Sequence, residues 1–186
     1  MVLWTIQSLP AWRELHETGV LRAKDCHLTE PSWRPAYRWM TQQMRFKIGP
    51  PPETDCQAMW AWYQWDGARK KPDLRCGGHL PPGERAVRLE LECPAGQALL
   101  SDFSLWHHVL NYWYLPSSEA EGDAFESELA DHGLSFYRQK PVPHDTYHRA
   151  IVESWDRVFD LGRSIQATMW QITLDQVQKC HYFTAR

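Results

Sequence analysis

The chain has 186 residues, 43% of them hydrophobic and 23% charged, so a single domain with a sizeable buried core is the simplest expectation. Its formal net charge of -3 excludes the basic footprint of a general duplex-binding protein. There is no apolar run of about 18 residues that could span a membrane and no signal-peptide pattern over Met1–Gln7, so we expect a cytoplasmic protein.

The first part of the chain predicts a strand and two helices. Val2–Gln7 is rich in β-forming residues and is expected to be a strand. Ser8 can cap a helix that Gly19 ends. A second helix is expected from Ser32 to Lys47, because its large apolar residues recur at helical spacing before Gly49 and three prolines stop it.

The middle of the chain predicts two strands and a capped helix. Ala58–Trp65 is expected to be a strand, with Trp60, Trp62 and Gln64 on one face and Ala61, Tyr63 and Trp65 on the other. Ala86–Cys93 alternates cleanly and predicts a half-exposed strand. Ser101 or Asp102 can then cap a helix that runs through Asn111.

The last part of the chain predicts another helix and two strands. Ser117–Asp131 carries six acids and no Lys or Arg, which indicates a solvated loop and a short helix. A helix is expected from His144 to Asp160, followed by strands at Ile165–Ile172 and Val177–Phe183. Strands near both ends with helices between them predict one α+β domain over residues 1–186, with a mixed or antiparallel sheet and flanking helices.

Cysteines and histidines give no pattern of a metal or disulfide framework. The five cysteines form no C-x-x-C pair and are expected to be free thiols. His144 and His148 lie four residues apart but lack the intervening glutamate of H-E-x-x-H. We therefore expect no metal.

Eleven tryptophans exceed what a core of this size needs, and several lie among polar groups. The segments concerned are Trp60–Asp66, Lys70–Arg75 and Ser101–Asn111. Aromatic planes beside Arg, Asp, His and Asn suit a planar, partly charged ligand such as a nucleotide base or nicotinamide. The alternative is a Trp-rich core with a capping Asp and a buried, hydrogen-bonded His.

These segments allow three functions. In a nucleotide-utilising enzyme, Asp102 or His107 would be the acid–base group and Arg75 would hold phosphate. In a non-catalytic module for a nucleotide or single-stranded RNA, aromatic side chains such as Trp62 and Tyr63 would stack on bases. In a protein-interaction domain, a Trp-rich patch would contact a partner. The ligand-binding residues predicted from these segments are Trp62, Tyr63, Arg75, Trp106 and Asn111.

Long phrases of the sequence resemble an uncharacterised bacterial family, the domain-of-unknown-function 3841 group. They are LWTIQ, IGPPP, WAWYQWDG, KKPDLR, LLSDFSLWHHVLN and IQATMWQI. The resemblance covers nearly the whole chain, and it implies no established activity.

The layout also resembles the ADP-ribosyltransferase fold. Leu3–Ile6, the helix after it and Gly19–Leu21 are similar to the opening of that fold, and Ile165–Thr168 to Val177 is similar to its close. The resemblance implies NAD as cofactor and places Trp4, Thr5 and Gln166 in the site. Trp4 replaces the family's His or Arg, and Gln166 stands where the Glu would be. In that family the Glu holds a ribose hydroxyl of NAD while the bond to nicotinamide breaks. A neutral Gln can form a hydrogen bond there, but it cannot balance the positive charge that develops on the ribose. The alternative is therefore a degenerate relative of the ADP-ribosyltransferases.

Overall fold

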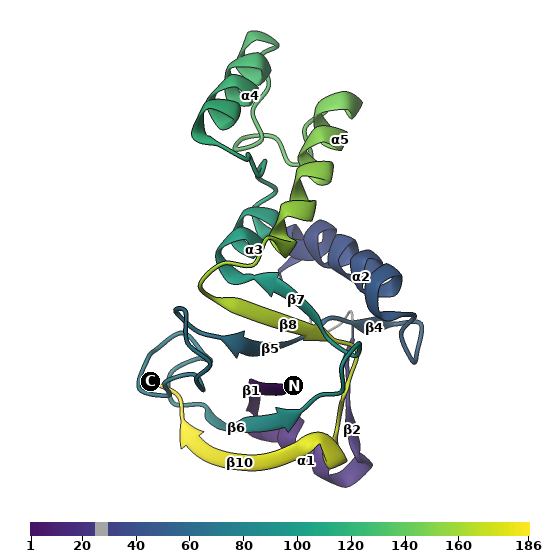
Figure 1. Ribbon diagram of the computed structural model, residues 1–186, viewed down its shortest axis with the longest axis vertical. Coiled ribbons are helices and arrows are strands. Elements are labelled where there is room, and N and C mark those ends of the chain that lie inside the picture. Colours follow the sequence, from purple (N-terminus) through teal and green to yellow (C-terminus); the bar gives the residue numbers. More distant parts are fainter. Residues whose placement is uncertain (25–29) are drawn as a thin grey trace.

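The computed structural model describes residues 1–24 and 30–186. Its centre is a six-stranded sheet in the order β10-β6-β1-β5-β8-β7, in which every neighbouring pair is antiparallel (Figure 1). The strands are β1 (Val2–Ser8), β5 (Met59–Gln64), β6 (Arg85–Glu92), β7 (Leu99–Asp102), β8 (Ile165–Met169) and β10 (Val177–Thr184). The predicted α+β class with an antiparallel sheet is confirmed, as are the predicted strands in this common sheet.

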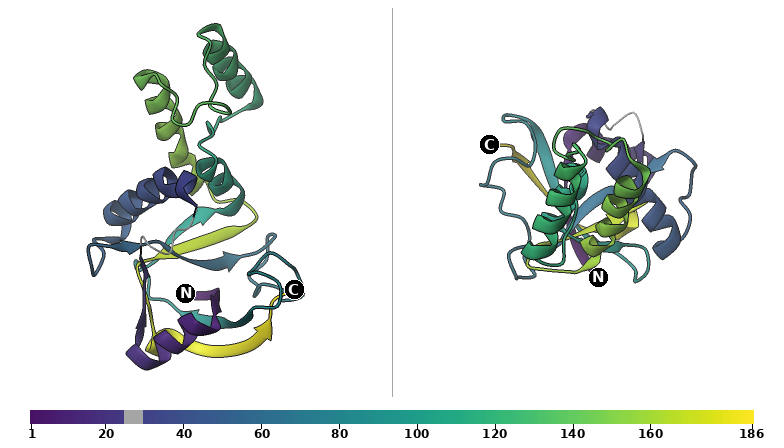
Figure 2. Two further views of the ribbon diagram at one scale, coloured as in Figure 1. Left: turned by 180° about the vertical axis from the view of Figure 1, so that it is seen from behind. Right: turned by 90° about the horizontal axis from the view of Figure 1, so that it is seen from above.

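Short strands and helices surround the sheet. Two small ladders join β2 (Val20–Leu21) to β9 (Ile172–Thr173) and β3 (Ala23–Lys24) to β4 (Cys56–Gln57). The α-helices are α1 (Leu9–Thr18), α2 (Arg34–Ile48), α3 (Phe103–Leu110), α4 (Glu119–Asp131) and α5 (Asp145–Ser154). In Figures 1 and 2, α2, α3 and α5 gather beyond the β7 end of the sheet, α1 lies at the β10 end, and α4 projects farthest. No helix in the described part of the chain is long and apolar enough to cross a membrane.

Side-chain caps set the helix starts that the sequence predicts. The Ser8 hydroxyl accepts a hydrogen bond from Ala11 N, and Gly19 ends α1 in the left-handed region at φ 80°. Asp102 accepts from Leu105 N and begins α3. The helix predicted from Ser32 begins as a 3₁₀ turn, Pro31–Trp33, and continues as α2.

The structure corrects three predicted boundaries. The acidic segment forms a full thirteen-residue helix, α4, because Ser118 caps it and Leu129 is buried against the neighbouring core. The helix predicted over His144–Asp160 is α-helical only to Ser154 and continues as a 3₁₀ turn, Trp155–Phe159. The strand predicted over Ile165–Ile172 breaks after Met169, where the Trp170 indole N–H turns away to donate to Gly49 O at 3.0 Å.

The sheet consists of two halves that meet at a narrow joint. β1 pairs with β6 over all seven of its residues but with β5 only at Trp4 and Trp62. Beyond that pair, the Thr5 hydroxyl donates to Trp60 O at 2.8 Å. The half-sheet β10-β6-β1 therefore diverges from the half-sheet β5-β8-β7 at this point.

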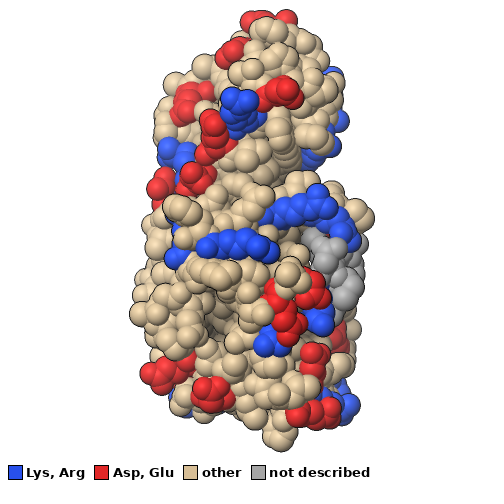
Figure 3. Space-filling view, turned by 90° about the vertical axis from the view of Figure 1, so that its right-hand side faces the viewer, with Lys and Arg blue, Asp and Glu red and all other residues tan. Residues whose placement is uncertain are grey.

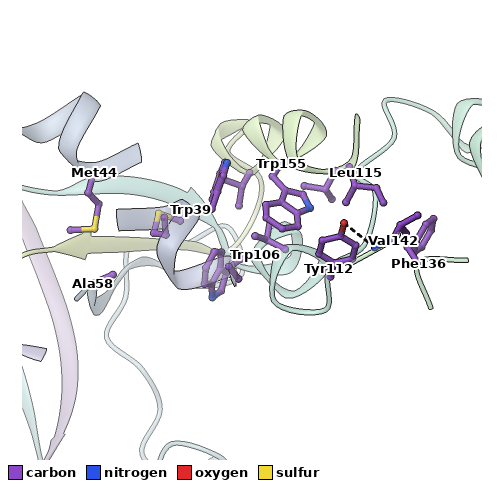
Figure 4. Packing of buried hydrophobic residues seen from close by; sticks show 14 of the residues in the cluster. Trp39, Met44, Ala58, Trp106, Tyr112, Leu115, Phe136, Val142 and Trp155 are labelled. Atoms are coloured by element: carbon purple, nitrogen blue, oxygen red, sulfur yellow. Dashed lines mark hydrogen bonds between the residues drawn. The ribbon is translucent and has the colours of Figure 1, made fainter. Parts of the chain in front are cut away.

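Two hydrophobic cores lie on either side of β5-β8-β7. The inner core contains residues of both half-sheets, including Leu3, Leu89 and Leu91 from one and Met59 and Ala167 from the other, so the halves face each other across it. The helical core, drawn in Figure 4, packs α2, α3 and α5 against the other face and contains the buried residues Trp39, Trp106, Tyr112, Phe136 and Trp155. The half-sheet β5-β8-β7 is thus covered on both faces.

Candidate functional site

A cavity of about 390 Å³ opens where β1 and β5 diverge. We call it the joint cavity. Its walls come from β1, β5 and β8, from the start of α3, and from a loop between β5 and β6. The lining residues are Thr5, Ile6, Trp60, Ala61, Trp62, Trp65, Pro72, Asp73, Cys76, Gly77, Gly78, His79, Phe103 and Gln166. The space exists because β1 and β5 pair only at Trp4 and Trp62 and then separate.

One wall of the joint cavity is aromatic. The Trp62 ring lies 4.7 Å from Trp65 and 4.8 Å from Phe103, measured between centroids. Trp65 was predicted on the opposite face of its strand from Trp62, and that prediction is wrong. A register shift between Trp62 and Gln64 breaks the alternation, so Trp65 turns back beside Trp62. Such rings offer planar faces and edges to a flat ligand.

Gln166, which lines the cavity, carries an unpaired hydrogen-bond acceptor on its side chain. Its Oε1 is buried and has no hydrogen-bond partner within residues 1–24 and 30–186. Across the β7–β8 ladder, Gln166 pairs with Ser101, whose hydroxyl oxygen is also buried without a partner in the same ranges. Buried polar atoms are almost always paired in folded proteins, so an unpaired carbonyl oxygen in a cavity marks a position where a ligand can donate a hydrogen bond.

The loop over the cavity is held by its own polar groups. The Arg75 guanidinium makes a two-pronged contact with the Asp73 carboxylate, with Nη2 at 2.7 Å, and holds the pKa of that carboxyl well below its usual range. Arg88 of β6 donates to Pro72 O at 2.9 Å and fixes the loop to the sheet. Cys76 presents an exposed thiol at this edge, and a ring nitrogen of His79 lies 3.0 Å from Asp73 O.

The structure brings some of the residues predicted for the site together and separates others. Thr5, Trp62 and Gln166 line the joint cavity. Arg75 is outside its lining, with a largely exposed side chain paired to Asp73. Tyr63 points to the other face of β5, where the Arg69 guanidinium lies 3.6 Å from its ring centroid. Trp4 donates through its indole N–H to Glu90 at 3.2 Å.

The predicted stripe on α3 serves the helix itself. Both oxygens of Asp102 accept backbone N–H groups, from Leu105 at 2.9 Å and from Gly162 at 3.1 Å. The His107 Nδ1 lies 2.8 Å from Phe103 O, and Asn111 donates to His107 O at 2.7 Å. Trp106 is only 3% exposed and belongs to the helical core, and Asp102 caps α3, as the Trp-rich core alternative expects. The side chain of His107 is exposed, so the buried histidine of that alternative is not found here.

Sequence reasoning missed part of the lining. Phe103 and Trp60 were not selected, although Trp60 lies in the same aromatic phrase as Trp62. Cys76 and His79 follow the basic loop, and only the fold of that loop places them at the cavity. The proline and glycine content of residues 72–83 was the available signal, because such loops often lie over binding sites.

The candidate metal ligands are outside the lining of the joint cavity. Glu53, Asp55 and Cys56 have potential ligand atoms within 4.8 Å of one another, but the two acids are exposed and nothing else at that place points to an ion. Of the histidines considered for a metal, His148 hydrogen-bonds to the Tyr112 hydroxyl and His144 contacts the Tyr147 ring. The described cysteines are free thiols, and Cys26 lies outside the described residues.

Comparison with known proteins identifies a family. The family model described as Domain of unknown function (DUF3841) matches residues 2–178. No curated protein matches the chain, and no solved structure matches it.

Proposed function

The chain belongs to the DUF3841 family, and we propose that it binds a nucleotide-type ligand in the joint cavity. The planar ring of the ligand lies against the wall formed by Trp62, Trp65 and Phe103. A ring or amide N–H of the ligand donates to Gln166 Oε1. The observation that carries this proposal is the buried oxygen of Gln166, which has no hydrogen-bond partner among the described residues, beside that aromatic wall.

The chemistry of the cavity favours this class of ligand. A volume of about 390 Å³ is within the range of small-molecule sites, and a lining that combines aromatic and other apolar side chains with a few polar groups is typical of them. A nucleobase or a nicotinamide is flat and carries N–H donors, so it can satisfy the ring wall and the acceptor together. A purely aliphatic ligand would leave Gln166 Oε1 unpaired, which costs about 1–3 kcal/mol.

We propose binding in preference to catalysis as the function of this site. The predicted acid–base residues lie outside the lining, and Asp102 has both oxygens engaged by backbone N–H groups. NAD-dependent ADP-ribosyl transfer is the second candidate. It is favoured by one observation, namely that Thr5 and Gln166, from distant parts of the sequence, line the same cavity. In that reaction the bond between nicotinamide and ribose would break and the ribose carbon would bond to a nucleophile of the target.

A thermal-shift screen against NAD, ATP and GTP tests the binding proposal. A ligand present at 100 times its Kd stabilises the folded state by about 2.7 kcal/mol. In a domain of this size that stabilisation raises the melting temperature by several degrees. We expect such a shift for the unmodified protein and for Gln178→Ala, an exposed glutamine on β10. Gln166→Ala and Trp62→Ala should melt without a comparable shift.

Cys76 provides an independent readout of where the ligand lies. Its exposed thiol is at the edge of the joint cavity, so a bound ligand should slow its alkylation. The partly exposed Cys180 on β10 is the internal control, followed by mass spectrometry of the same sample. Protection of Cys180 alone, or an equal thermal shift in Gln166→Ala, would place the ligand elsewhere. Release of nicotinamide from NAD together with covalent attachment of ADP-ribose to a target would establish the second candidate, because hydrolysis of NAD alone also releases nicotinamide.

A further inference from the structure

A second cavity, of about 470 Å³, lies among the helices and belongs to a different part of the fold from the joint cavity. Its walls come from the start of α2, the end of α3, the segment around Lys140 and α5. The buried rings of Trp39 and Trp155, 5.8 Å apart and edge to face, are among its lining residues. We call it the helical cavity.

The charged side chains at the helical cavity are all basic. Arg38 and Lys140 line it, and the described lining contains no Asp or Glu. Neither cation forms an ion pair with any residue in the described ranges. In a chain whose net charge is -3, two such cations at one cavity indicate an anionic ligand.

The basic character continues along α2. This helix contains Arg34, Arg38, Arg45 and Lys47 and no acid. Arg38 and Arg45 are seven residues apart, close to two helical turns, so they lie on the same side of α2. On the face shown in Figure 3, Lys and Arg side chains gather at mid-height, the level at which α2 lies in Figure 1. An extended polyanion could therefore contact the cavity and the helix together.

His148 adds a directed donor. Val142 N donates to the Tyr112 oxygen at 3.3 Å, and the same hydroxyl lies 2.5 Å from His148 Nδ1. Where the Tyr112 hydroxyl donates to Nδ1, the ring proton of His148 is on Nε2, which can then donate to a ligand. His148 lines the cavity, which adds a further hydrogen-bond donor to the two cations.

Trp33 completes the pattern with an exposed ring. It lies in the turn before α2, lines the cavity and is 40% exposed. A large ring left in solvent beside cations is a typical platform for an unpaired base.

We infer that the helical cavity and α2 form a binding site for single-stranded nucleic acid. One base enters the cavity against Trp33, and the backbone phosphates contact Arg38, Arg45 and Lys140. A duplex keeps its bases stacked inside and cannot supply a free base to the cavity. This site goes beyond the proposed function of the joint cavity and does not depend on it.

Fluorescence anisotropy with labelled twelve-nucleotide RNA, single-stranded DNA and duplex DNA tests the inference. Removing one stacking ring should weaken binding about tenfold, so Trp33→Ala should raise the Kd for single strands by that factor. Arg38→Glu and Lys140→Glu should also raise it and reduce the slope of log K against log salt, because fewer counterions are released. The matched control is Arg13→Glu on the exposed side of α1, which lies at the β10 end of the sheet, away from α2. It should bind as the unmodified protein does.

Each outcome decides between named alternatives. Tight binding of RNA over single-stranded DNA supports the site and assigns it to RNA, and equal binding supports it without selection at the ribose. The inference is overturned if no single strand binds, if the duplex binds equally well, or if Arg13→Glu weakens binding as much as Arg38→Glu. Displacement by an acidic peptide with no effect of Trp33→Ala would identify a protein partner instead. Because NAD, ATP and GTP are tested at the joint cavity through Gln166, failure there leaves this result unchanged.

Discussion

Asp102 connects two segments of the chain through two oxygen atoms. Oδ1 caps α3 through Leu105 N, and Oδ2 accepts from Gly162 N just before β8. Replacing it with alanine removes the cap and leaves the Gly162 N–H without its acceptor. We expect Asp102→Ala to lower the free energy of unfolding by roughly 1–3 kcal/mol, measured by urea denaturation. A variant that unfolds like the unmodified protein yet loses ligand binding would instead make Asp102 a residue of the site.

Gly162 tests the same contact from its other side. A Cβ at this position would lie 2.7 Å from Asp102 Oδ2, closer than real Cβ atoms approach an oxygen. We therefore expect Gly162→Ala to be destabilising by roughly 1–3 kcal/mol in the same denaturation experiment. In the Asp102→Ala background the obstructing oxygen is gone, so the added methyl should cost less. Equal costs in both backgrounds would show that the carboxylate does not cause the clash.

At this scale the sequence was informative where a residue acts on its neighbours. The cap at Ser8 and a cap at Ser101 or Asp102 follow from residue type and position, because the groups that such caps satisfy lie within three residues, and the structure selects Asp102. Gln166 could be selected through resemblance, but its unpaired oxygen depends on which strands flank β8. Trp65 was placed on the wrong face because a bulge is a tertiary adjustment that alternation does not predict.

Among the elements, α4 is joined to the segment before it by hydrogen bonds that depend on pH. Glu121 accepts hydrogen bonds from Ser117 and from the Tyr114 hydroxyl, which lower its pKa from 4.5 to about 2. Since the folded state holds the proton less tightly than the unfolded chain, this contribution to stability is present above about pH 4.5 and is lost as the pH falls towards 2. We expect Glu121→Gln to show a smaller loss of stability over that interval, measured by urea midpoints at pH 6 and pH 3. Glu119→Gln removes the same charge from the same turn and is the control. An unchanged loss in Glu121→Gln would contradict this role of the hydrogen bonds.

The elements themselves were largely predictable, whereas their arrangement was not. Periodicity and stop signals located α1, α2, β5 and β6 to within a few residues. The order of strands and the narrow joint between β1 and β5 depend on residues more than fifty positions apart, such as Trp4 and Trp62, and a pattern within one segment carries no information on that pairing.

At the scale of the whole molecule, the half-sheet β5-β8-β7 holds two cores together. Leu89 is fully buried in the inner core and Ile151 in the helical core. If residues 1–186 form one cooperative domain, as the sequence predicts, Leu89→Ala and Ile151→Ala should each cost about 2–5 kcal/mol and move one shared transition. Circular dichroism and tryptophan fluorescence would follow it. Separate transitions for the two variants would show two folding units.

The late position of β8 has a consequence for synthesis on the ribosome. β5 and β7 both pair with β8, and residues 165–169 are made about a hundred positions after β5. Until then, the nascent chain can close the β1–β6 ladder but must leave the edges of β5 and β7 unpaired. Open strand edges recruit other strands, and pairings between such distant segments form slowly. A ribosome stalled shortly before residue 165 should therefore display a chain that cellular chaperones hold. A ribosome that carries all 186 residues followed by a C-terminal linker should display a chain that chaperones release.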